Sequence, residues 1–179
     1  MSDYRIERDT LGDVEVPAQA LYGAQTQRAV RNFPISGLRL PPEFIRAQAV
    51  TKWAAARANM DGGRLDPDIG GALVSAAEEI LAGQHHEHFV VDVFQAGAGT
   101  SQNMNMNEVL AHRASQLLAA RGLTEVRVSP NDHANMGQST NDTIHVAIHV
   151  AAYCEIHRRL IPAAEELSRA LRHKAVEFD

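Results

Sequence analysis

The stretch DPDIGGALVSAAEEILAG, residues 66–83, contains both ends of one helix and indicates the fold class. Asp66 is a favourable N-cap, Pro67 fits the first helical turn, and Gly83 stands where a left-handed C-cap belongs. The apolar residues between these ends recur with the helical period and are Ile69, Leu73, Ala76, Ala77, Ile80 and Leu81. We therefore predict a helix with one buried face.

The neighbouring segments extend this helical pattern. Residues 43–60 have a wide, alanine-rich apolar face, which suits close packing between helices. Further helices are predicted over residues 105–121 and from residue 141 onward, with Pro162 breaking or restarting the last one near residue 160.

The other segments give few strand signals. Residues 1–40 read as irregular because glycine and proline recur in them, and the β-branched and aromatic residues 89–94 predict one short extended segment. The fold class is therefore mostly α.

Composition excludes several classes of protein. The 179 residues are 45% hydrophobic and 22% charged, which argues against disorder, and 17 Lys+Arg against 22 Asp+Glu form no basic stripe for nucleic acid. The charged start lacks the apolar core of a signal peptide, and no apolar run reaches the roughly 18 residues of a membrane span. We expect a cytoplasmic protein with no nucleic-acid or membrane partner.

Two polar loops, residues 95–108 and 129–142, each precede a predicted helix. Their glycines allow close backbone approach, their hydroxyls donate hydrogen bonds, and a helix start adds free N–H groups. Such a loop can bind an anion without lysine, and two loops suit a small dicarboxylate. The structural alternative is that Ser, Thr, Asn and Asp here only cap helices. Asn103, Asn105 and Asn107 weaken that alternative, because asparagine is a poor helix former.

At these residues the sequence resembles the aspartase / class II fumarase family of lyases. The strongest matches are Gly97-x-Gly99-Thr100-Ser101-x-Asn103-Met104-Asn105 and Pro130-Asn131-Asp132-x-x-Asn135-x-x-Gln138-Ser139-Thr140-Asn141-Asp142. The resemblance implies an amino-terminal helical lyase domain over residues 1–140, with residues 141–179 starting the central helical bundle. It also implies a homotetramer whose active sites combine segments from three subunits.

The resemblance further implies elimination from a 2-substituted succinate to give fumarate, with donors stabilising an aci-carboxylate intermediate. Substrate-binding residues carried over by position are Thr100, Ser101, Asn103, Ser139, Thr140 and Asn141. The family's base, a serine on a mobile loop, lies downstream, so no catalytic residue is assigned here and this chain alone is expected to be inactive. No cofactor and no metal are expected.

The leaving group is less clear than the substrate class. Ala98, where fumarases usually carry serine, resembles aspartases, whereas the run 103–107 and the segment 22–28 resemble fumarases. We favour ammonia from aspartate, with water from malate as the alternative and a non-catalytic helical assembly protein as a further one. Succinyl-purine and argininosuccinate lyases usually differ in the first loop.

Three further features lie outside the two loop motifs or at their edge. The family's secondary dicarboxylate site includes a histidine before Pro-Asn-Asp, but Ser129 stands here, so a site at Asn131 and Asp132 is doubtful. The histidines of residues 84–88 follow a helix-ending glycine and read as a solvated turn rather than as a metal site. The apolar positions from Ile144 onward lack partners within the chain, which predicts self-association through an exposed helix face.

Overall fold

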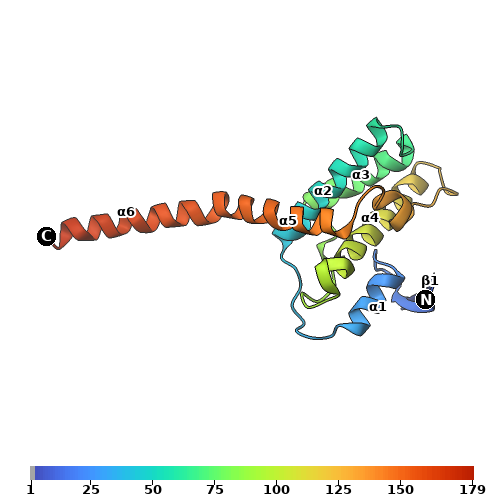
Figure 1. Cartoon of the computed structure of the whole chain (residues 1–179), viewed down its shortest axis with the longest axis horizontal. Coiled ribbons are helices and arrows are strands. Elements are labelled where there is room, and N and C mark those ends of the chain that lie inside the picture. The colour runs from blue at the N-terminus through green and yellow to red at the C-terminus, as the bar shows by residue number, and fades with distance from the viewer. Residues whose placement is uncertain (1–2) are drawn as a thin grey trace.

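The computed structural model describes residues 3–179 and consists mostly of helices (Figure 1). In chain order, the elements are β1 (Tyr4–Asp9), β2 (Gly12–Pro17), α1 (Ala24–Asn32), α2 (Pro42–Asp61), α3 (Pro67–Leu81), η1 (His86–His88), η2 (Gly97–Gly99), α4 (Thr100–Ala120), η3 (Pro130–Ala134), α5 (Thr140–Glu155), η4 (Ile156–Leu160) and α6 (Ile161–Glu177). This confirms the predicted mostly-α fold class. Within residues 3–179, no helix has both the length and the apolar composition needed to cross a membrane.

The predicted ends of α3 are confirmed. The Asp66 side chain accepts hydrogen bonds from the N–H groups of Asp68 and Ile69, and Pro67 is the first helical residue. Gly83 follows the helix with φ +90°, a conformation that glycine adopts without the steric cost of a side chain. The buried face of α3 packs between α2 and α4 and includes Leu73, Ala76, Ala77 and Ile80.

The prediction that residues 1–40 are irregular is wrong. Strands β1 and β2 pair antiparallel, with Tyr4 opposite Pro17 and Asp9 opposite Gly12, and α1 follows them. Val14 and Val16 on β2 are buried, but each strand has only six residues and the glycines and prolines of this region dominate the pattern, so it read as irregular. The extended segment predicted over 89–94 forms only one isolated bridge, from Asp92 to Arg39.

Helix α1 obtains its N-terminal cap from another helix. Gly23 at the N-cap has no side chain, and the buried carboxylate of Glu108 on α4 accepts the N–H groups of Gly23 (2.8 Å), Gln25 (3.0 Å) and Thr26 (3.1 Å). One carboxylate therefore satisfies three of the four N–H groups that a helix start leaves unpaired.

The sequence predicts that Pro162 breaks or restarts the last helix near residue 160, and the helix restarts there rather than breaking. Helix α5 continues through the π-type turn η4 into α6, and the N–H of Ile161 bonds to the carbonyl of Ile156, five residues back. The wider turn accommodates a proline, which lacks an N–H and whose ring would crowd the preceding α-helical turn.

Helices α5 and α6 form one long helix, and its second half extends away from the rest of the chain (Figure 1). The buried residues of α5 are Thr143, Ile144 and Ala147 in its first half, and α6 has none. Exposed apolar side chains follow one another from Val146 and Ile148 through Leu160 to Leu171. An exposed apolar face is thus present, but it begins at Val146, because Ile144 is buried; self-association and the division at residue 140 stay predictions.

Candidate functional site

The first polar loop leads into α4 through two consecutive left-handed residues. Ala98 (φ +58°) and Gly99 (φ +73°) turn the chain immediately before Thr100, where the helix starts. A side chain on Gly99 would lie 3.0 Å from Ile144 on α5, so glycine allows the two predicted loops to approach closely. The helix therefore starts five residues earlier than predicted, and Thr100 and Ser101 lie in its first turn.

Thr100 and Ser101 present their hydroxyls differently. Thr100 is exposed and its hydroxyl donates to the carbonyl of Gly97 (3.1 Å), whereas Ser101 is buried and lines a cavity of about 290 Å³ with Gln25 and Arg28 of α1. The next N–H, that of Gln102, is already bonded to the Gln95 side chain at 2.7 Å. A ligand at this helix start would therefore bind through Ser101 or replace the bond from Thr100 to Gly97.

The second polar loop leads into α5 through a capping box. The Ser139 hydroxyl accepts from the N–H of Asn141 (3.3 Å), and the Asp142 carboxylate accepts from the N–H of Ser139 (2.8 Å). Ser139 thus has a capping role, as the structural alternative expected. Thr140 is half-buried and Asn141 is exposed, so both can reach a ligand.

A buried polar cluster joins the two loops. The Oδ1 atom of Asn135 accepts from Lys52 Nζ (2.9 Å), Asn103 Nδ2 (3.1 Å) and Asn107 Nδ2 (3.2 Å). Asn103 also contacts Thr140, through a 3.4 Å bond from Nδ2 to Oγ1, and accepts the hydroxyl of Thr143 at Oδ1. The structure therefore brings Asn103 of the first loop to Thr140 of the second.

The three asparagines of α4 have separate roles. Asn105 fixes the preceding segment, because its Nδ2 donates to the carbonyl of His88 and its Oδ1 accepts from the N–H of Val90. Only Asn103 and Asn107 belong to the cluster with Asn135. The buried atoms Asn107 Oδ1 and Gln48 Nε2 have no hydrogen-bond partner, which is uncommon for buried polar groups.

Lys52 is the site residue that sequence reasoning missed. It lies in the middle of α2, is 3% exposed, and burial lowers the pKa of its ammonium to about 7. A lysine in an amphipathic helix normally reads as part of the solvated face, and no loop motif contains it. Its apolar neighbours, such as Ala49 and Ala56, indicated only that this part of the helix is buried.

The lowered pKa of Lys52 makes stability depend on pH. From about pH 7, where the folded chain releases this proton, up to its ordinary pKa of 10.5, the unfolded chain binds more protons. The free energy of unfolding should therefore rise with pH relative to a Lys52→Met variant, by on the order of 1 kcal/mol per unit. Denaturant melts of both full-length proteins at several pH values between about 7 and 9 measure this, and parallel curves would contradict it.

The two residues of the secondary dicarboxylate site lie on the surface. Asn131 and Asp132 are exposed in η3, and the Asp132 carboxylate accepts the Ser129 hydroxyl at 2.7 Å. Ser129 also accepts the N–H of Asp132, so it acts as an N-cap. A carboxylate at this surface repels a dicarboxylate rather than binding it, which disfavours the site.

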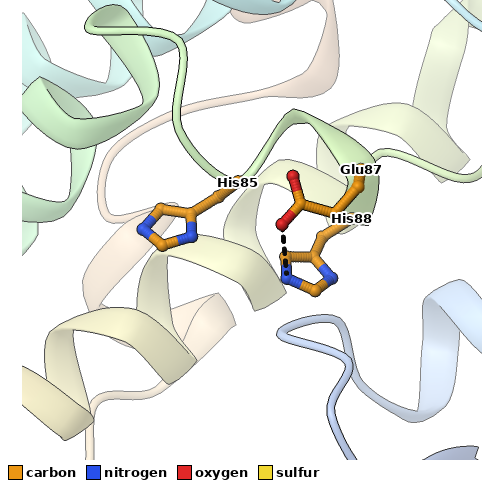
Figure 2. Close-up of side chains that lie close together, drawn as sticks. All are labelled: His85, Glu87 and His88. Carbon is orange, nitrogen blue, oxygen red and sulfur yellow. Dashed lines mark ion pairs between the residues drawn. The ribbon is translucent and has the colours of Figure 1, made fainter.

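The turn over residues 84–88 is only partly solvated, because Gln84 and Glu87 are exposed but the histidines are half-buried. The side chains of His85 and His88 are only 19% and 17% exposed, and Glu87 is 70% exposed. Figure 2 shows the three side chains gathered on one side of the turn.

The sequence profile of a family described as Lyase matches residues 12–179. The chain is 51% identical over 177 residues to the class II fumarate hydratase of Halobacterium salinarum, covering 99% of this chain. This chain belongs to the fumarate lyase superfamily. It spans about 37% of the length of that relative, so it corresponds to only part of such a lyase.

Other superfamily members give the same result. The mitochondrial fumarate hydratase of Rhizopus oryzae is 49% identical, and the match covers 100% of this chain and 36% of that protein. The crystal structure of the class II fumarase from Schistosoma mansoni superposes with a TM-score of 0.89 at 35% identity, over 97% of this chain and 37% of that one. A crystal structure titled fumarate lyase:delta crystallin, from Brucella melitensis, has a TM-score of 0.79 at 43% identity, over 86% and 36%.

These relatives bear on the leaving group. The relatives described above are named fumarate hydratase, fumarase or fumarate lyase, and none is named for ammonia elimination. The comparisons therefore support water, the alternative reading, better than the ammonia that the sequence favoured. Ala98, one of the residues that favoured ammonia, adopts a left-handed conformation in the turn before α4.

Proposed function

We propose that the full-length protein containing this chain is a fumarate hydratase that interconverts malate and fumarate. The observation that carries the proposal is the direct joining of the two loops through Asn103, Thr140 and Asn135. This arrangement places two helix starts side by side, each with hydroxyl donors, as binding the two ends of one dicarboxylate requires.

Within this proposal, each loop has a separate task. Thr100 and Ser101, in the first turn of α4, bind one substrate carboxylate. Thr140 and Asn141, in the first turn of α5, bind near the other polar end, while Asn103 and Ser139 hold the loops in place. Donors fixed before the reaction stabilise the extra negative charge of the intermediate without reorganisation.

Lys52 contributes charge to the same region. Its ammonium lies beneath both loops, bonded to the neutral oxygen of Asn135. A bound dianion favours the protonated form of Lys52, which in turn attracts the dianion. We propose that the base that removes the C3 proton is supplied by a downstream part of the full-length protein. We also propose that this protein is a homotetramer and that it is located in the cytoplasm.

A matched kinetic comparison tests the proposal. Purified full-length protein is mixed with malate or with aspartate at equal concentrations, and fumarate is followed by its ultraviolet absorbance. We expect fumarate from malate and none above background from aspartate. Fumarate from aspartate alone would establish ammonia elimination instead, and conversion of neither substrate would support a non-catalytic assembly protein of the same fold.

A further inference from the structure

The turn after α3 gathers three side chains that are typical metal ligands. One donor atom each from His85, Glu87 and His88 lies within 4.8 Å of the others, and Figure 2 shows all three on the same side of η1. Imidazole nitrogens with a carboxylate oxygen are ligands that Zn²⁺ binds readily. None of these residues belongs to the two substrate loops.

The orientation of His85 is fixed by a residue behind it. Its Nε2 bonds to Glu79 Oε2 at 2.8 Å, and Glu79 is itself held by Arg113 through bonds of 2.6 and 2.9 Å. In Figure 2 the other ring nitrogen of His85 faces the Glu87 carboxylate and His88. A carboxylate on one ring nitrogen, with the second nitrogen turned toward neighbouring ligands, is the usual arrangement of metal-binding histidines.

The Glu87–His88 pair already has the spacing of two ligands in a metal site. His88 Nε2 and Glu87 Oε1 are 3.5 Å apart, close to the separation of about 3.4 Å between two donors of a tetrahedral zinc site. The His88 backbone is fixed because its carbonyl accepts Asn105 Nδ2 and its N–H bonds to the His85 carbonyl.

The surrounding charges do not prevent a cation from binding. The guanidinium of Arg5, on the nearby strand β1, is paired with Glu7 and bonded to the carbonyls of Pro17, Ala20 and Tyr22. Exposed Glu87 supplies a negative charge on the solvent side of the cluster.

We propose that His85, Glu87 and His88 form a binding site for a divalent transition-metal ion, with Zn²⁺ as the preferred ion and water as the fourth ligand. The three donor atoms already lie within 4.8 Å of one another, so the site closes through small movements, chiefly of the exposed Glu87 side chain, while the bond to Glu79 holds His85 in place.

Zinc titration of the full-length protein against a chromophoric chelator tests this site. His85→Gly removes one imidazole at a position with φ +64°, which glycine adopts without strain, and Glu87→Gln removes the exposed carboxylate. Each variant should weaken Zn²⁺ binding at least about tenfold while its melting temperature without metal stays close to that of the wild type. Cobalt titration, followed by visible absorption, gives a second readout of ligand geometry.

The matched control is a double variant, His145→Ala with His149→Ala. These two histidines are exposed and four residues apart on α5, a spacing that can bind zinc on its own. The control should keep wild-type affinity. Loss of binding in the control but not in His85→Gly would overturn the proposal, as would a wild-type protein that binds no zinc.

Discussion

Replacing Lys52 with methionine should lower kcat/KM for malate by about 10²- to 10³-fold without unfolding the protein. Methionine has a similar length and fills the buried space, but it removes the cation that lies beneath both loops. Asn135 Oδ1 keeps its two other donors, Asn103 and Asn107, so the loops remain joined. Steady-state kinetics in both directions, with circular dichroism of each protein, measure the effect.

Arg57→Met is the control for this experiment. Arg57 lies on the same helix as Lys52, is exposed, and stacks over Trp53, so its replacement removes a positive charge away from the loops. Its kcat/KM should stay within about twofold of the wild type, since surface charges are weakly coupled to the site through water. A Lys52→Met protein as active as Arg57→Met would show that the buried ammonium has no part in substrate binding.

Replacing Glu108 with alanine should lower the free energy of unfolding by about 3–4 kcal/mol. The Glu108 carboxylate is the cap of α1, and its removal leaves three N–H groups without their acceptor. Glu108→Gln should lie between alanine and the wild type, because an amide keeps only one acceptor oxygen. Denaturant unfolding measures all three proteins.

Glu125→Ala is the matched control for stability. Glu125 is exposed in the loop after α4, and its replacement should change the free energy of unfolding by less than about 0.5 kcal/mol. If Glu108→Ala were as mild as this control, the three hydrogen bonds to α1 would not stabilise the fold.

The helices were predictable where the sequence contains helix-end residues, a periodic apolar face, or both. Asp66, Pro67 and Gly83 defined α3, and the same period of apolar residues defined α2. The hairpin and α1 were not predictable in this way, because their stability comes from distant partners. Glu108 caps α1 from 82 to 85 residues away, and such a contact leaves no local signal.

The candidate site was predictable only in part. The two loops were identified because glycines, hydroxyls and amides cluster before helices, and the structure brings Asn103 to Thr140 as a shared dicarboxylate site requires. Lys52 could not be found, since a single lysine in a helix gives no indication of burial. The capping role of Ser139 was expected only as the structural alternative, and the same residue types serve both purposes.

A crystal structure of the full-length protein with a bound dicarboxylate, such as fumarate, tests the central claim most directly. The predicted result places one carboxylate within hydrogen-bond distance of Thr100 and Ser101 and the other end of the same molecule next to Thr140 and Asn141. A dicarboxylate that contacts neither helix start, or that binds only one of them, would contradict the claim that the two loops bind one substrate together.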